Sequence, residues 1–343
     1  MTDIHTLVRE NVKKLTPYSC ARDEFKGSSG IFLDANENPW GNLNRYPDPY
    51  QKELKKAVSE FKGIPVENIF LGNGSDEIID LCFRVFCQPG VDKALIFPPT
   101  YGMYEVSASV NDVQIIKLPL NQSFQIDIQK VTPMLSDRNL KLIFICSPNN
   151  PTGNSINASD VEFILSQCSC VVVIDEAYID FSDKPSLRSL TGKYPNLIVM
   201  QTFSKAFGLA SVRVGMAFTN KDIVQYFNKI KPPYNISTIN QRRALERIIK
   251  PEKMARQVRK IRKEKEKLVS KLAKLDLTEL IYPSDANFIL VKVKDPDLIY
   301  SELVKRNIIT RNRSSVVNGC IRITVGKPSE NRQLLSALKT IRL

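Results

Sequence analysis

A series of apolar runs with helical segments between them constrains the fold of this chain more than any other feature. The runs are rich in β-branched residues. They are centred near Phe70, Ile96, Phe144, Val173, Val199 and Met216. Continuous apolar runs of this length are typical of strands that helices cover on both faces. The segments 75–86 and 157–168 have the character of such helices. The alternation predicts a mostly parallel sheet that gathers functional residues at the carboxyl ends of its strands.

The pattern changes after residue 250. A long segment of helical period, 251–275, leads into a shorter alternation of apolar runs and helical segments. We therefore predict three parts: an N-terminal segment (1–45) that packs across the domains, a large domain (46–250) and a small C-terminal α/β domain (251–343).

Residue content excludes several classes of function. His5 is the only histidine, which all but excludes a His-based triad or a zinc site. The seven cysteines include no CxxC pair, and several lie in apolar runs, so we expect buried thiols in a reducing compartment. No apolar run approaches the ~18 residues of a membrane helix, and residues 1–15 lack the apolar centre of a secretory signal. These features predict a cytoplasmic protein with no membrane partner and no metal site.

The formal net charge of +13 raises the alternative of a nucleic-acid-binding protein. Much of this charge lies in 251–275, where glutamates are interspersed and apolar residues recur at helical spacing. That pattern is typical of an amphipathic helix with a solvated basic face. Since no basic stripe interleaved with aromatic residues accompanies it, we expect no nucleic-acid partner.

Three motifs follow three of the predicted strands. They are SPNNPTG (147–153), IDEAY (174–178) and TFSKAFG (202–208). Each has an ordinary explanation by itself: NNPTG could be only a turn, and VVVIDEA resembles the strand and acid of an ATPase magnesium site. The chain contains no GxxxxGK[ST] phosphate loop, which argues against the ATPase. The shared placement at strand ends favours one site built from all three motifs.

Together these motifs supply the groups that pyridoxal phosphate requires. Lys205 would condense with the cofactor aldehyde, because a desolvated lysine has a lowered pKa and stays nucleophilic. Asp175 would keep the ring nitrogen protonated, which makes the ring an electron sink. Asn150 and Tyr178 would donate to the ring oxygen. Tyr101 would stack on the ring, although core packing explains a tyrosine there equally well.

The segment GNGSDEII (72–79) predicts the site of the cofactor phosphate. A helix begins there, and its free N–H groups and dipole favour an anion. The N–H groups would be those of Gly74, Ser75 and Asp76. Ser204 and Arg213 would add a hydroxyl and a cation. The pair of glycines alone is weak evidence, because the third glycine of a dinucleotide loop is absent.

The motifs together resemble those of the fold-type I pyridoxal-phosphate-dependent aminotransferases. The resemblance covers nearly the whole chain, through LTPYSCAR, LDANENPWG, RYPDP, GNGSDEII, PTYGMYE, CSPNNPTG, VIDEAYIDF, TFSKAFGLASVRVG and CIRITVG. It implies an α/β fold like that of aspartate aminotransferase, with a three-layer α/β/α large domain that binds the cofactor. It supports the roles given above and implies a homodimer in which Tyr46 reaches the cofactor phosphate of the neighbouring subunit.

The resemblance is strongest to the branch of the family that acts on histidinol phosphate. It implies transamination between L-histidinol phosphate and 2-oxoglutarate, giving imidazole acetol phosphate and L-glutamate in histidine biosynthesis. Arg322 would bind the substrate carboxylate, and Tyr18 and Arg311 would contact the substrate. The loop RNRSSVVNGC is shorter than usual, so Arg313 is an alternative to Arg311. A related enzyme for aromatic amino acids, or one that decarboxylates a phosphorylated amino acid, is the alternative function.

Overall fold

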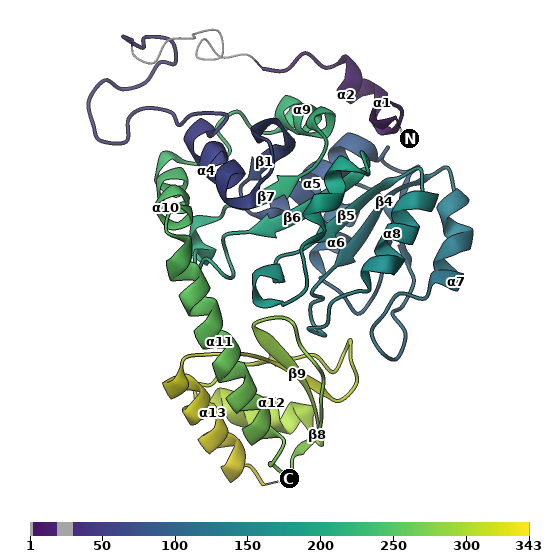
Figure 1. Cartoon of the computed structure of the whole chain (residues 1–343), viewed down its shortest axis with the longest axis vertical. Helices are drawn as coiled ribbons and strands as arrows, with labels where there is room; N and C mark the ends of the chain where they lie inside the picture. The colour runs from purple at the N-terminus through teal and green to yellow at the C-terminus, as the bar shows by residue number, and fades with distance from the viewer. Residues whose placement is uncertain (1–2, 19–29, 343) are drawn as a thin grey trace.

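The computed structural model describes residues 3–18 and 30–342, and its largest element is a seven-stranded sheet (Figure 1). The strand order is β1-β7-β6-β5-β4-β2-β3. The strands are β1 (Ile69–Gly72), β2 (Lys93–Ile96), β3 (Gln114–Lys117), β4 (Leu140–Cys146), β5 (Val171–Asp175), β6 (Leu197–Thr202) and β7 (Gly215–Phe218). Only β7 within this sheet runs antiparallel to its neighbours, β1 and β6. The predicted mostly parallel sheet is confirmed. Cys20, with part of the LTPYSCAR motif, lies outside the described residues.

Helices cover both faces of this sheet, which explains the continuous apolar runs. Phe144 and Val173 pack on one face with α5 (Ser75–Phe86), whereas the alternating Ile143 and Val172 pack on the other with α8 (Ala158–Gln167). The remaining helices around the sheet are α1 (Ile4–Leu7), α2 (Glu10–Lys14), α4 (Lys52–Lys62), α6 (Met103–Val110), α7 (Ile128–Val131), α9 (Lys221–Ile230) and α10 (Thr238–Ile248). The large part of the chain is therefore a three-layer α/β/α structure, as expected.

A second, antiparallel sheet follows in the C-terminal part. Its strands are β8 (Thr278–Ile281), β9 (Phe288–Val293), β10 (Arg311–Asn312) and β11 (Cys320–Thr324), in the order β10-β11-β9-β8. It packs with α12 (Pro296–Lys305) and α13 (Pro328–Thr340). No helix within 3–18 and 30–342 is long and apolar enough to cross a membrane.

The long basic segment forms α11 (Pro251–Leu272), which joins the two sheets (Figure 1). Met254 and Val258, near its start, belong to the core of the large part, and Leu268 and Leu272, near its end, belong to the core of the small sheet. One amphipathic helix thus contributes to both cores. The exact domain boundaries, after residues 45 and 250, stay predictions.

The strand register brings the three sequence motifs to one edge of the large sheet. Cys146, at the end of β4, is in register with Asp175, which is in register with Met200 near the end of β6. The antiparallel β7 begins at the same edge, where its Gly215 is paired with both Thr202 and Gly72. The loops after β1, β4, β5 and β6, and the turn before β7, therefore converge there.

Candidate active site

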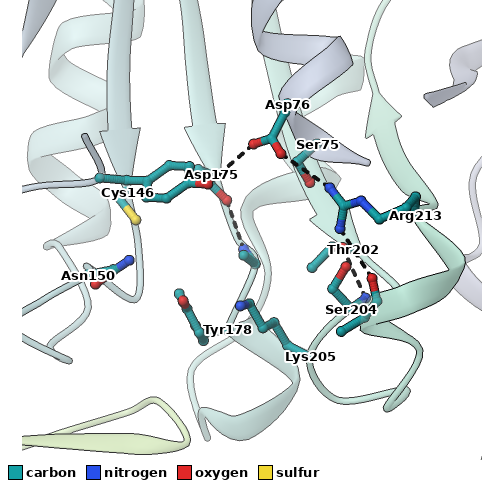
Figure 2. Close-up of a pocket in the computed structure, with 13 residues that line it drawn as sticks. Ser75, Asp76, Cys146, Asn150, Asp175, Tyr178, Thr202, Ser204, Lys205 and Arg213 are labelled. Atoms are coloured by element: carbon teal, nitrogen blue, oxygen red, sulfur yellow. Dashed lines mark hydrogen bonds and ion pairs between the residues drawn. The ribbon is translucent and has the colours of Figure 1, made fainter. Parts of the chain in front are cut away.

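A cavity of about 150 Å³ lies at this edge (Figure 2). Its lining comprises Ser75, Asp76, Tyr101, Cys146, Asn150, Asp175, Ala177, Tyr178, Thr202, Ser204, Lys205, Ala210 and Arg213. Nine of the residues predicted from the sequence are among them. Cys146 and Thr202 were not predicted, although both end strands that the apolar runs had located.

Asp175 ends β5 and is only 4% exposed. Burial raises the pKa of this carboxyl group, whereas two hydrogen bonds and the nearby Lys205 lower it. Its Oδ2 accepts from the hydroxyl of Tyr104 at 2.9 Å, and its Oδ1 accepts from the N–H of Ala177 at 3.0 Å. These donors stabilise the carboxylate form in a desolvated place.

Tyr104 was not predicted as a site residue. It is fully buried on α6, and its ring stacks on that of Phe144 at a centroid distance of 4.8 Å. The only sequence signal for Tyr104 was its spacing of three residues from Tyr101 at the start of a helix, which brings the two side chains to neighbouring positions.

Lys205 lies in the turn after β6, and its side chain opens into the cavity. Its Nζ lies 5.4 Å from the centre of the Tyr178 ring. Desolvation by the surrounding protein lowers the pKa of Lys205, the charge of Arg322 lowers it further, and Asp175 opposes both effects. The arrangement favours a neutral amine more than water would, which is the form that attacks an aldehyde or accepts a proton.

The start of α5 and Arg213 form an anion cradle, by which we mean Gly74, Ser75, Asp76 and Arg213. Arg213 donates through Nη2 to Asp76 Oδ2 at 3.2 Å, and Tyr101 donates its hydroxyl to Asp76 Oδ1 at 3.2 Å. The hydroxyl of Ser75 is buried and has no hydrogen-bond partner in the part of the chain described. Gly74 has a φ of +76°, and a Cβ there would lie 2.5 Å from Arg213 Nη2. The lack of a Cβ at Gly74 therefore makes room for the guanidinium of Arg213, and the Ser75 hydroxyl can donate to an anion bound in the cradle.

Figure 2 shows the side chains of the cradle (Ser75, Asp76 and Arg213) and Ser204 at one end of the cavity, with Asn150 and Tyr178 toward the other. The N–H of Ser204 donates to Thr202 Oγ1 at 3.0 Å, which orders the turn that leads to Lys205. An elongated group with an anion at one end would thus place its other end between the amine of Lys205 and the polar side chains of Asn150 and Tyr178.

Arg322 reaches this site from the second sheet. It lies on β11 and donates through Nη1 to Asn150 Oδ1. Its guanidinium lies 5.2 Å from the centre of the Phe288 ring, and Tyr178 packs edge-on against the same ring. The Nε of Arg322 is buried and finds no acceptor among the described residues. A cation with an unused donor beside the cavity is suited to an anionic substrate.

Two further arginines lie near Arg322. Arg311 is exposed on β10 and is paired in register with Arg322. Arg313 is half-buried, and its Nε is also buried without an acceptor in residues 3–18 and 30–342. Burial and the charges of Arg322 and Arg311 lower the pKa of Arg313. None of the three has an ion-pair partner in those ranges, so their positive charge is available to a ligand.

Tyr18 and Tyr46 lie outside the cavity in the single chain. Tyr18 is 71% exposed and lines a small separate cavity with Tyr50 and Lys229. Tyr46 is half-exposed and stacks on Tyr234, with a centroid distance of 4.4 Å and an interplanar angle of 13°. Their roles toward substrate and cofactor stay predictions.

The site fits a phosphorylated aromatic aldehyde with a ring nitrogen. Lys205 supplies the amine, Asp175 supplies a buried acid, and the anion cradle supplies an unused hydroxyl, a cation and a helix start. The fold and the site together define the class of enzymes that hold a phosphorylated ring cofactor through a lysine.

Comparisons with known proteins give the family. The family model described as aminotransferase class I and II matches residues 31–338. The histidinol-phosphate aminotransferase of Cytophaga hutchinsonii is 51% identical over 344 residues, covering 98% of this chain and 99% of that protein. The one of Parabacteroides distasonis is 50% identical over 347 residues, covering 100% of both. This chain belongs to the aminotransferase class I and II family.

Solved structures agree with this assignment. The histidinol-phosphate aminotransferase from Clostridium acetobutylicum has a TM-score of 0.80 at 26% identity, covering 87% of this chain and 90% of that one. The one from Sinorhizobium meliloti, solved in complex with pyridoxal-5'-phosphate, has a TM-score of 0.79 at 24% identity, covering 87% and 82%. The fold is that of the fold-type I aminotransferases.

Proposed function

We propose that this enzyme transfers the amino group of L-histidinol phosphate to 2-oxoglutarate, giving imidazole acetol phosphate and L-glutamate in histidine biosynthesis. The observation that carries the proposal is the convergence of Lys205, Asp175 and the anion cradle on one cavity. The relatives at 50–51% identity that are named for this reaction support the choice of substrate.

Pyridoxal 5'-phosphate, when bound, supplies an aldehyde that condenses with amines and a ring that takes up electrons from the amine-bearing carbon. The anion cradle and Ser204 would hold its phosphate, and Tyr101 would lie against the ring. Asp175 would accept a hydrogen bond from the protonated ring nitrogen while keeping those from Tyr104 and Ala177. Asn150 and Tyr178, at the opposite end from the cradle, would donate to the ring oxygen.

Lys205 is the proposed proton carrier. Its lowered pKa leaves a larger fraction of Nζ neutral, and a neutral amine can accept the proton from the amine-bearing carbon of the substrate. The positive charge of Arg322 contributes to this lowering, so the residue that binds the substrate anion also tunes the base.

Arg322 and Arg313 are the proposed substrate-anion site. Both keep a buried Nε for which no described residue is an acceptor, and a guanidinium binds either a carboxylate or a phosphate through paired hydrogen bonds. The two substrates, which share the site in turn, offer one of these groups each. Arg311 is exposed and lacks this signature, so we place Arg313 ahead of it.

A homodimer is also proposed, in which Tyr46 contacts the cofactor phosphate bound by the partner subunit. The segment before Tyr46 exposes several large apolar side chains, which a single chain rarely leaves in water. They are Ile31 (92% exposed), Leu33 (88%), Trp40 (81%) and Leu43 (66%). A second copy of the chain would cover them. A molar mass of one chain by light scattering would contradict this.

A cytoplasmic location accords with six buried, free cysteines in the described chain.

The decisive experiment is the visible spectrum of the purified enzyme before and after adding one amino donor at a time. Histidinol phosphate should convert the bound cofactor in a single half-reaction, and 2-oxoglutarate should restore it. Conversion by phenylalanine or threonine phosphate but not by histidinol phosphate would overturn the substrate. Borohydride treatment and peptide mapping should place the cofactor on Lys205, and an unmodified Lys205 in active enzyme would overturn the site.

A further inference from the structure

A second cavity, of about 310 Å³, lies between α4 and α9. It shares no residue with the catalytic cavity. Both helices pack on the end of the large sheet at β1, and Figure 1 shows them in the upper part of the molecule, away from the second sheet. Lys52, Lys55 and Lys221 contribute three lysines to its lining, against the single acid Glu67. This cavity, which we call the α4–α9 cavity, therefore carries an excess of positive charge.

Lys55 is the unusual residue of this cavity. The residue as a whole is only 6% exposed, and its ammonium group has no hydrogen-bond or ion-pair partner among the described residues; its Nζ is not a buried atom and meets the open space of the cavity. The other buried lysine of α4, Lys62, is paired with Asp180 at 3.3 Å. The buried Lys231 donates to the carbonyl groups of Pro232 and Pro233. Lys55 thus differs from Lys62 and Lys231, because its ammonium group ends a buried side chain and faces the cavity, with no protein acceptor beside it.

A second polar atom is left without a partner in the same place. The side-chain oxygen of Asn228, on α9, is buried and accepts no hydrogen bond from any described residue. Val66 and Val224 give the cavity an apolar wall. The lining thus offers cations, an acceptor that needs a donor, and an apolar surface.

We propose that the α4–α9 cavity binds a small organic anion, with its acidic group at Lys52, Lys55 and Lys221 and its apolar body against Val66 and Val224. A hydroxyl or N–H group on the ligand would satisfy Asn228. The acidic group of such a ligand would give the ammonium group of Lys55 the anionic partner that the described residues do not supply. This site is separate from the transaminase reaction.

Binding at this site should be linked to proton uptake. Burial, with the charge of Lys231, lowers the pKa of Lys55 to about 8, and Asp48 opposes this. The charged groups around Lys55 are Asp48, Lys52, Glu67, Lys221 and Lys231. About half of Lys55 is therefore neutral at pH 8, and a bound anion favours the charged form, so each binding event should take up as much as about 0.5 proton.

Calorimetric titration of the holoenzyme with benzenesulfonate at pH 8 tests the proposal, because the charge of this anion does not change with pH. Titrations in two buffers of different ionisation enthalpy give the proton uptake. The variant Lys55→Met should weaken binding at the α4–α9 cavity at least about tenfold and abolish the uptake. Methionine keeps the buried aliphatic part of the side chain and removes a charge that burial disfavours, so the variant should fold about as stably. The matched control Lys56→Met changes the exposed neighbour and should bind like the original chain.

Three results would overturn the proposal. The first is that the original chain does not bind benzenesulfonate. The second is that it binds without proton uptake. The third is that Lys55→Met keeps both the affinity and the uptake of the original chain. Benzenesulfonate bound at Arg322 would be recognised because it would persist in Lys55→Met and would involve no proton uptake by Lys55. If this were the sole binding seen, the proposal would be wrong. The double variant Lys52→Met/Lys221→Met changes exposed residues only and should weaken the same binding several-fold. 4-(Hydroxymethyl)benzenesulfonate, which offers a hydroxyl to Asn228, should bind more tightly than benzenesulfonate.

Discussion

Replacing Tyr104 by phenylalanine should impair catalysis although Tyr104 does not line the catalytic cavity. The hydroxyl of Tyr104 is buried and donates to Asp175 at 2.9 Å, and phenylalanine would keep the stacking on Phe144. A hydrogen bond to a charged acceptor is worth about 1.5–3 kcal/mol, which corresponds to a loss of about 10- to 150-fold in kcat/KM. Because the Tyr104 hydroxyl lowers the pKa of Asp175, its loss should raise that pKa further. The carboxylate is lost as the pH falls, so the acid limb of the pH profile should move to higher pH.

The assay is kcat/KM for histidinol phosphate as a function of pH, measured in a double-mutant cycle with Asp175→Asn. If Tyr104 is a positioning residue that acts only through Asp175, Tyr104→Phe should cost less than about twofold in the Asp175→Asn background. The full loss in that background, or a loss with no movement of the acid limb, would refute the reasoning. Circular dichroism and unfolding curves would show that the fold is kept.

Three further predictions concern the base, the cradle and the substrate anion. The folded protein lowers the pKa of Lys205 from 10.5, so unfolding takes up a proton at pH values between the folded and the unfolded pKa. The free energy of unfolding of the cofactor-free enzyme should therefore rise as the pH approaches 10.5. Lys205→Met should be more stable than the original chain at pH 7 and should lack this rise, as measured by denaturant titration. Gly74→Ala should weaken cofactor affinity at least about tenfold, because its Cβ would collide with the guanidinium of Arg213. The control is Gly63→Ala, which also has a positive φ but has open space around it. This control should keep cofactor affinity and only lower the free energy of unfolding by about 1 kcal/mol. Arg313→Met should raise the KM for histidinol phosphate at least about tenfold, against less than about threefold for Arg311→Met; the reverse order would return the substrate role to Arg311.

The parts of this fold that follow from local pattern could be predicted from the sequence. The predicted helix at 75–86 coincides with α5, because its apolar period and its polar start are both local features. The run at Val171–Val173 located β5, and with it Asp175 at the strand end. Strand β3 escaped prediction since its four residues are only partly buried at the edge of the sheet, so the apolar signal is short and weak.

The site contacts that escaped prediction join residues far apart in the chain. Tyr104 and Asp175 are 71 positions apart, and Arg322 and Asn150 are 172 positions apart. No local period encodes which buried hydroxyl faces which carboxylate, because packing of α6 on the sheet decides it. Arg313 was left as an alternative for the same reason: its half-buried position depends on how β10 pairs with β11.

The anion cradle can be completed only after most of the large sheet's sequence has been synthesised. Its two halves, the start of α5 and Arg213, meet across 137 positions. A nascent chain that has emerged only as far as β6 has the helix start but lacks the guanidinium. If the cradle binds the cofactor phosphate as proposed, firm binding requires that β7 has joined the sheet between β1 and β6. Acquisition of the cofactor's yellow colour would then report that the central sheet is complete, which makes colour a simple assay for productive folding of this enzyme during expression.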